Sequence, residues 1–279
     1  MIDQVPVGEP LSKSHFVRVS PDQDPIKPFF LLYALRAILP ADAPQYRACM
    51  CGRYTRHYTW EQVRDFLDLR FPDELGLREA YNVAPTHRAP IVRLRGKDRE
   101  MSLAAWGLVP AWATDPGVGV KMFNARSETV AEKPAYREAY RKRRCVVPVS
   151  GFYEWPKRSH PKTPHYFSRA DEQIMCLAGL WERWDRGEGA LETFTVITTD
   201  ANETVSPIHP RMPVVLEPDA IGVWLGAGGA PDEARALLRP AAPGVIQSWP
   251  VASFVGDVRR DGPELIEPQQ PDRGLFDAL

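Results

Sequence analysis

Prolines interrupt this chain at short intervals, and they limit how long its helices and strands can be. The 279 residues include 28 prolines, about twice the usual proportion of roughly 5%. Because proline has no backbone N–H, it ends helices and interior strands and marks turns. The prolines are spread along the chain and form no proline-rich tract. This pattern predicts short elements joined by many loops.

Segments with strand character outnumber segments with helical character. Strands are expected at 53–55, 90–95, 102–107, 145–149, 151–155, 165–169, 173–180, 192–198 and 212–216. The segments 165–169 and 173–180 are expected to pair as a hairpin through Ala170-Asp171-Glu172. The long β-branched segment 192–198 is expected to be a central strand.

Fewer helices are expected, and they do not alternate with the strands. Thr59 followed by Gln62 has the pattern of a capping box and predicts a helix over 60–69. Further helices are expected over 133–142 and over 218–225, where proline occupies the first helical position. A strand-rich chain without β-α alternation predicts an α+β fold with a mainly antiparallel sheet.

The composition is that of a globular chain and leaves nucleic-acid binding open. Charged residues make up 25% and hydrophobic residues 44%, and the formal net charge is -1. A near-zero net charge does not indicate a nucleic-acid partner, although a local basic face would suffice for one. The most apolar stretch, 29–39, is interrupted by Arg36 and is shorter than the ~18 residues of a membrane span. No membrane association is expected, and the stretch begins too late for a signal peptide.

The cysteine spacing excludes the common zinc motifs. The four cysteines are Cys49, Cys51, Cys145 and Cys176, and no two of them form a C-x-x-C pair. Cys145 and Cys176 lie in apolar segments and are expected to be buried structural thiols. This usage fits a reducing cytoplasm, and no metal or cofactor is expected.

The segment Met50-Cys51-Gly52-Arg53 contains a cysteine whose reactivity depends on where the mature chain begins. If Met50 were an initiator that is removed, Cys51 would be the first residue of the mature chain. It would then carry an α-amine with a pKa of about 7.7–8.0 beside a thiol with a pKa of about 8.5. Together these groups can capture an aldehyde, first as an imine and then as a five-membered thiazolidine ring. An internal cysteine cannot do this, because its nitrogen is an amide.

Six further motifs follow Met50-Cys51-Gly52-Arg53 along the chain. They are Tyr81-Asn82-Val83-Ala84-Pro85, Trp106-Gly107-Leu108-Val109-Pro110-Ala111-Trp112, Asn124-Ala125-Arg126-Ser127-Glu128-Thr129, Arg144-Cys145-Val146-Val147-Pro148, Gly151-Phe152-Tyr153-Glu154-Trp155 and Ile208-His209-Pro210-Arg211-Met212-Pro213-Val214. In this order they closely resemble the SOS response-associated peptidase (SRAP) family, and the resemblance covers about 50–268.

The resemblance implies both a fold and a function. The family fold is a single compact domain around a curved sheet. Family members trap abasic sites in single-stranded DNA covalently through an N-terminal cysteine, as part of DNA repair and the SOS response. The implied partner is therefore single-stranded DNA with abasic sites. A cytoplasmic monomer that associates with the nucleoid when it engages DNA is expected.

The resemblance also divides the chain. Residues 50–268 correspond to the SRAP domain, and 269–279 form a polar, proline-containing tail that is expected to be flexible. Residues 1–49 lack a clear period and are expected to be poorly ordered. Two origins for them stay open: translated sequence upstream of the true start, or a genuine pro-segment removed by self-cleavage before Cys51.

Four residues are the candidates for chemistry: Cys51, Glu154, His209 and Asn124. Glu154 lies between two aromatic residues, so desolvation should raise its pKa and suit it to proton transfer near neutral pH. His209 lies in an irregular segment with two prolines, and histidine can donate or accept a proton at pH 7. Both match the acidic residue and the histidine of the family motifs. Asn124 matches a family asparagine, and its amide can orient an amine or a sugar hydroxyl.

Six residues are the candidates for DNA contact. They are Arg53, Asn82, Pro85, Trp112, Arg126 and Arg211. The arginines suit bidentate contact with phosphate, and Glu128 could instead pair with one of them. Trp112 and Pro85 suit stacking or wedging of bases. For Trp106, a place in the core is favoured over stacking. Some family members have a second tryptophan after the position of Trp112, where this chain has Ala113.

Two rival functions use the same residues differently. An N-terminal-nucleophile amidohydrolase or cysteine peptidase would use the Cys51 thiol with its own amine as base, including self-cleavage before Cys51. A nucleic-acid binding module without chemistry would keep its function in Cys51→Ala. An aldehyde partner gives a stable adduct, whereas a peptide partner would be turned over.

Overall fold

The computed structural model describes residues 51–70, 75–157, 163–187, 189–226 and 231–269. The predictions for 1–49, and for all but the first residue of the tail at 269–279, lie outside the described residues. Within the described part of the chain, no helix is long and apolar enough to span a membrane.

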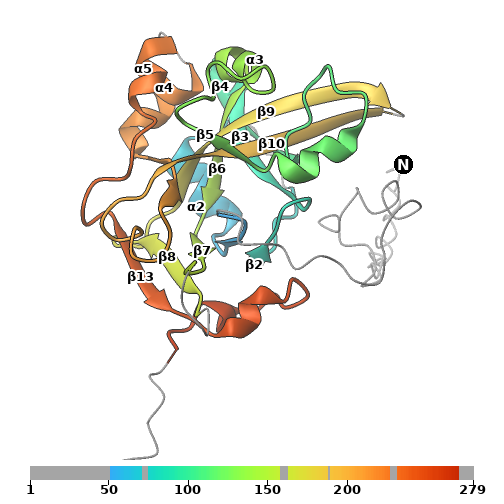
Figure 1. Ribbon diagram of the computed structural model, residues 1–279. Helices are drawn as coiled ribbons and strands as arrows, with labels where there is room; N and C mark the ends of the chain where they lie inside the picture. Colours follow the sequence, from blue (N-terminus) through green and yellow to red (C-terminus); the bar gives the residue numbers. More distant parts are fainter. Residues whose placement is uncertain (1–50, 71–74, 158–162, 188, 227–230, 270–279) are drawn as a thin grey trace, which may run out of the picture.

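The larger of the two sheets has eight strands, and five of them close into a ring (Figure 1). They are β3 (Arg88–Arg95), β4 (Asp98–Trp106), β6 (Arg144–Val149), β9 (Met175–Gly187) and β10 (Gly189–Asp200). Their order is β10-β4-β3-β6-β9, and β9 pairs back to β10. Only the β4–β10 pairing in this ring is parallel.

Three short strands extend the ring. They are β5 (Asn124–Arg126), β11 (Arg211–Pro213) and β12 (Val215–Leu216). β5 lies parallel to β10, β11 lies antiparallel to β10, and β12 lies antiparallel to β9. β10 thus carries β5 and β11, and these two strands bring distant segments of the chain to one end of the ring.

The second sheet has five strands, all antiparallel, in the order β13-β8-β7-β1-β2. They are β1 (Tyr54–Arg56), β2 (Ala80–Val83), β7 (Gly151–Glu154), β8 (His165–Arg169) and β13 (Ile246–Pro250). Because successive side chains on a strand face opposite sides, Phe152 and Phe167 enter the core shared with Trp106 of β4, whereas Tyr153 and Tyr166 lie on the other face. The prediction of an α+β fold with mainly antiparallel sheet is confirmed.

The helices are short. They are α2 (Trp60–Leu67), α3 (Arg137–Lys142), α4 (Ile221–Leu225) and α5 (Pro231–Ala236), with 3-10 turns η1 (Pro116–Lys121), η2 (Pro218–Ala220), η3 (Ser253–Gly256) and η4 (Pro263–Ile266). The predicted capping box is present: Thr59 Oγ1 accepts from the Gln62 N–H at 3.2 Å, and Gln62 Oε1 accepts from the Thr59 N–H at 2.7 Å. α2 ends at Leu67 because Asp68 adopts a left-handed φ of 49°. The other two predicted helices are shorter than expected, and 218–225 is divided between η2 and α4.

The predicted hairpin of 165–169 with 173–180 is wrong. β8 pairs with β7 and β13 in the smaller sheet, whereas β9 pairs with β6, β10 and β12 in the ring. The intervening turn redirects the chain from one sheet to the other. In this turn Arg169 forms a bidentate ion pair with Asp171, at 2.9 and 2.8 Å. Glu172 adopts a left-handed backbone conformation, with a φ of 59°. β2, β5 and β13 were not predicted, and the expected strand at 212–216 is divided between β11 and β12.

Candidate active site

Cys51, Glu154 and His209 converge where the smaller sheet meets the ring. The β1–β7 register pairs Tyr54 with Phe152, so two residues further along, Glu154 lies beside the start of β1. The Cys51 N–H donates to Glu154 Oε1 at 2.5 Å, and His209 Nδ1 lies 3.8 Å from the same oxygen. All three residues are buried, with at most 4% of their surface exposed. Cys51 and His209, which are distant in the sequence, thus share one carboxylate oxygen of Glu154.

Asn124 completes this cluster from the side of the ring. It is the first residue of β5, which β10 holds in parallel register through the pair of Val196 with Asn124. Its Nδ2 donates to the carbonyl oxygen of Cys51 at 3.4 Å, and its own carbonyl accepts from the hydroxyl of Tyr136 at 3.3 Å. The structure therefore brings all four candidates for chemistry together.

Burial shifts the Glu154 carboxyl toward its neutral form. Desolvation raises the pKa of Glu154 to about 7, although hydrogen bonds from Cys51 and the Trp155 backbone and the charge of Lys157 oppose the shift. A carboxyl group with this pKa exchanges a proton readily at neutral pH.

His209 is held with its ring between Glu154 and the chain that follows it. Its Nδ1 lies 3.1 Å from both the backbone nitrogen and the carbonyl oxygen of Arg211. If Nδ1 carries the ring proton it donates to the carbonyl, and if it does not it accepts from the Arg211 N–H. Its Nε2 is buried and has no hydrogen-bond partner among the described residues. Burial lowers the pKa of His209, so its ring is neutral at pH 7 and can accept a proton.

The Cys51 thiol is protonated in this arrangement. Burial, and then the negative charge of Glu154, raise the pKa of Cys51 well above its usual value. Its backbone φ is +39°, a left-handed conformation that few residues other than glycine adopt. Here its nitrogen is an amide, because Met50 precedes it. The other described thiols, Cys145 and Cys176, are buried and unpaired, which confirms the expectation for them.

The side chains of Arg53 and Asn82 are engaged by the protein itself, Arg53 half-buried and Asn82 buried. The Arg53 guanidinium donates to Asn82 Oδ1 at 2.7 Å and to the carbonyl of Val255 at 3.0 Å. Asn82 is 3% exposed, and its amide reaches the carbonyls of Val255, Asp257 and Arg260 at 3.2, 3.0 and 2.9 Å. Both side chains hold the segment around η3, a contact between distant parts of the chain that sequence patterns did not indicate.

The guanidinium of Arg211 is also hydrogen-bonded within the protein. It donates to Glu128, to Asp200 Oδ1 at 2.7 Å and to the Thr198 carbonyl at 2.7 Å. The expected pairing of Glu128 with one of the arginines is confirmed. Arg126, at the end of β5, is exposed and available for a phosphate.

The candidates for base contact differ in exposure. Trp112 is 60% exposed, and Pro85 is half-buried in the turn after β2. Trp106 is 1% exposed and donates its indole N–H to the Phe123 carbonyl at 2.8 Å, so its place is the core. Thr86 beside Pro85 has a φ of +77°, which is rare for a β-branched residue. No sequence signal indicated that strain.

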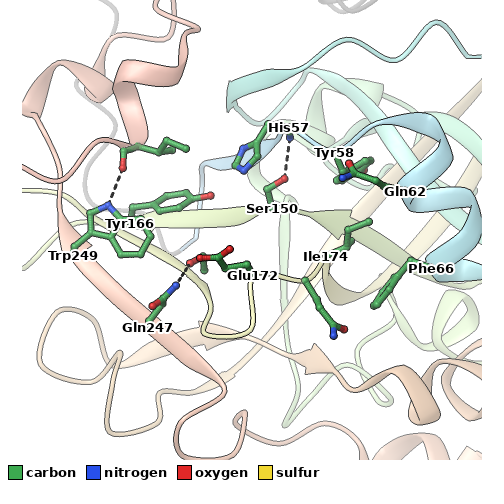
Figure 2. A pocket seen from close by; sticks show the side chains of 13 residues that line it. His57, Tyr58, Gln62, Phe66, Ser150, Tyr166, Glu172, Ile174, Gln247 and Trp249 are labelled. Carbon is green, nitrogen blue, oxygen red and sulfur yellow. Dashed lines mark hydrogen bonds between the residues drawn. The ribbon is translucent and has the colours of Figure 1, made fainter.

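A cavity of about 520 Å³ lies away from this cluster. Tyr166, Ser168 and Trp249 line it together with residues of α2, and Figure 2 shows Tyr166 and Trp249 beside each other along one side. Tyr166 alternates with Phe167, which faces the core that contains Cys51. The cavity therefore lies on the opposite face of the smaller sheet, and none of the candidate residues lines it.

Comparison with known proteins agrees with the resemblance in the motifs. The family model described as SOS response associated peptidase (SRAP) matches residues 50–258. The abasic site processing protein YoqW of Bacillus subtilis is 37% identical over 78% of this chain and 99% of its own length. YedK of Escherichia coli, with the same description, is 31% identical over 78% of this chain and 100% of its own.

A relative from Gallus gallus and a solved structure agree. The abasic site processing protein HMCES of Gallus gallus is 36% identical over 68% of this chain and 66% of its own length. A crystal structure of a protein from Bacteroides thetaiotaomicron superimposes with a TM-score of 0.68 at 27% identity, covering 79% of this chain and 100% of that one. The chain therefore belongs to the SOS response-associated peptidase (SRAP) family.

Proposed function

We propose that this protein processes abasic sites in single-stranded DNA by capturing them covalently, in a mature form that begins at Cys51. The observation that carries the proposal is the shared carboxylate. Glu154 Oε1 lies 2.5 Å from the Cys51 nitrogen and 3.8 Å from His209 Nδ1. The relatives described as abasic site processing proteins support the substrate class.

The first step forms an imine. In the mature form an α-amine takes the position of the amide nitrogen beside Glu154. Its lone pair attacks the aldehyde carbon of the opened sugar, and Glu154 or His209 takes the proton that the nitrogen loses. The same groups return this proton to the former carbonyl oxygen, which gives a carbinolamine. A second proton passes from the nitrogen to that hydroxyl by the same route, and the oxygen leaves as water when the C=N bond forms. A carboxyl pKa of about 7 suits both transfers.

The second step closes the ring. The thiol sulfur attacks the imine carbon, the C=N electrons move to nitrogen, and the thiol proton ends there. Because the thiol pKa is raised by burial and by Glu154, the amine is the better first nucleophile. The sum of both steps is a thiazolidine plus one water, without any redox change. Asn124 orients the Cys51 carbonyl during these steps.

The DNA is held by side chains around this cluster. Exposed Arg126 contacts a phosphate, and exposed Trp112 and half-buried Pro85 contact bases beside the lesion. Arg211 is bound by Glu128 and Asp200, so it contributes to DNA binding only where a phosphate displaces a carboxylate. Arg53 and Asn82 act through the segment that they hold.

Incubation of the form 51–279 with a single-stranded oligonucleotide that contains one abasic site tests the proposal. A heat-stable band of reduced mobility is expected on a denaturing gel, and Cys51→Ala should abolish it. Cys51→Ser should give only a labile imine, because a thiazolidine needs sulfur. Cys176→Ser is the matched control and should react like the parent. An adduct of equal yield from Cys51→Ala would contradict the proposal.

A second candidate activity is hydrolysis of the bond before Cys51. The left-handed φ of Cys51 favours it, because such strain costs on the order of 1–3 kcal/mol and this dihedral no longer exists once Cys51 is the first residue. Intact mass of the purified full chain over time distinguishes the candidates. Release of 1–50 by the parent but not by Cys51→Ala would establish self-processing, and unchanged mass in both would exclude it.

A further inference from the structure

Residues 253–261, here called the η3 loop, expose apolar and basic side chains and are tied to the segment that follows Cys51. Phe254 and Val258 are 36% and 49% exposed. They are two of the four exposed large hydrophobic side chains among the described residues, and one of the other two is Trp112. Arg259 and Arg260 follow directly and are also exposed. The capture chemistry uses none of these loop side chains.

The loop has a fixed position relative to Cys51. Arg53 lies two residues after Cys51, and its guanidinium donates to two carbonyls of the loop, at 3.0 and 3.3 Å. Asn82 of β2 is buried and donates to the same Val255 carbonyl and to those of Asp257 and Arg260. In Figure 1 the loop is the red segment below β2. Val255 of the loop packs with Tyr153 and Tyr166, on the face of the smaller sheet opposite the core that contains Cys51. The loop therefore borders the segment that leads from Cys51 into β1, and a DNA strand held at Cys51 reaches it by passing that edge of the sheet.

Two of the exposed side chains, Phe254 and Arg260, are in cation–π contact. Arg260 Cζ lies 4.8 Å from the centroid of the Phe254 ring. Arg259 is paired with Asp257 of the same loop at 2.8 Å, whereas no described carboxylate forms a salt bridge with Arg260. A planar guanidinium supported on one face by an aromatic ring presents its other face and its N–H groups outward. Such a plane stacks on nucleobases and donates to phosphate.

We propose that the η3 loop is a second contact surface for single-stranded DNA, which takes a nucleotide flanking the abasic site. The base stacks on the pair formed by Phe254 and Arg260, and the neighbouring phosphate accepts from Arg260. The inference rests on the proposed function, because it places the lesion at Cys51. It gives half-buried Arg53 and buried Asn82 a part in DNA binding through the loop that they hold.

The test measures affinity and adduct formation on the same oligonucleotides. Each carries one abasic site and is extended stepwise on the 5′ side or on the 3′ side. Affinity of the form 51–279 should rise when one of the two sides is extended far enough to reach the loop. The double variant Phe254→Ala/Arg260→Ala should lose about 5- to 100-fold of affinity on that side alone, the range expected for one stacked base. Its adduct rate at saturating DNA should stay that of the parent.

Two variants make the result specific. Arg141→Ala removes an exposed arginine from α3, at the other end of the molecule (Figure 1), and should leave the affinity unchanged. Arg260→Lys keeps the positive charge but lacks the planar guanidinium. Its DNA affinity should therefore keep the salt dependence of the parent and lose part of the increase that follows extension of the oligonucleotide.

Three outcomes are decisive. The inference would be overturned if extension raised the affinity of the double variant as much as that of the parent. This is the result expected if the loop binds a protein partner instead of DNA. A double variant with a slower adduct rate at saturation would overturn it too, because the loop would then act on the site itself. Absence of any adduct from the parent would contradict the proposed function, while the extension series on the same DNA would still report on the loop.

Discussion

Glu154 is a buried carboxyl group, and its ionisation is linked to the stability of the fold as well as to the chemistry. Burial raises the pKa of Glu154 from 4.5 to about 7. Between these two values the folded protein holds a proton that the unfolded chain has released. Stability therefore falls as the pH rises through this window, by up to about 3 kcal/mol for a shift of this size.

Replacing Glu154 with Gln should remove that pH dependence. The variant should be more stable than the parent near pH 7, and its free energy of unfolding should change less between pH 4.5 and 7. The adduct rate should fall by about 10²- to 10⁴-fold with DNA affinity retained, as for loss of a general acid–base group. Urea unfolding over a pH series and single-turnover adduct formation measure the two effects.

Glu182→Gln is the matched control for this experiment. Glu182 is also buried, at 5% exposed, but it pairs with Arg143 at 2.7 Å. Its variant should keep both the pH dependence and the adduct rate of the parent. If Glu154→Gln lost affinity and kept its rate, Glu154 would be structural, and the proton transfers would fall to His209 or to the amine.

Residue motifs identified the centre of the site better than its surroundings. Cys51, Glu154, His209 and Asn124 lie together as their motifs implied. The same reasoning offered Glu128 as a partner for one of three arginines but could not assign it to Arg211, and it did not indicate Asp200, because these partners come from other segments of the chain. Which charges an arginine meets depends on how strands assemble, and a short motif does not contain that information.

At the scale of elements, local signals were reliable where the interaction itself is local. The capping box of α2 involves residues three apart, and it is present as predicted. The prediction that β8 pairs with β9 was wrong because the pairing of a strand depends on segments that are distant in the sequence. β13 was missed for a related reason: its residues Ile246–Pro250 pair with β8, far away in the sequence.

The η3 loop depends on such distant contacts, and this can be tested directly. Asn82→Ala removes the amide that holds three of its carbonyls, which should cost about 1–3 kcal/mol per unsatisfied buried group. The side chains of Arg259 and Arg260 are already exposed, but opening of the loop should let the backbone at these residues enter the active site of trypsin. Faster cleavage after these residues is expected for Asn82→Ala, and Arg141→Ala should be cleaved there at the parental rate. Equal rates for all three proteins would mean that Asn82 does not hold the loop.

At the scale of the whole molecule, the site is divided between the two sheets. Cys51 and Glu154 belong to the smaller sheet, whereas Asn124 and His209 come from segments attached to β10 of the ring. Their spacing is therefore set by the core between the sheets. Trp106 is at the centre of that core, with ring centroids 4.9 Å from Tyr54 of one sheet and 6.1 Å from Phe194 of the other.

Trp106→Phe should consequently impair both stability and chemistry, while Trp224→Phe should impair stability alone. Both indoles are buried, at 1% and 0% exposed, and each donates its N–H to a backbone carbonyl at 2.8 Å. Each change removes volume and one hydrogen bond, so each should cost about 2–4 kcal/mol. Trp224 packs in the separate cluster beneath α4, away from the contact between the sheets.

Urea unfolding and single-turnover adduct formation on the same two variants measure the difference. The adduct rate of Trp106→Phe should fall more than its DNA affinity, because the amine and the carboxyl group no longer keep their spacing from His209 and Asn124. Trp224→Phe should react at the parental rate under conditions where both variants are folded. Equal rates for the two variants would show that each sheet holds its half of the site without help from the core between them.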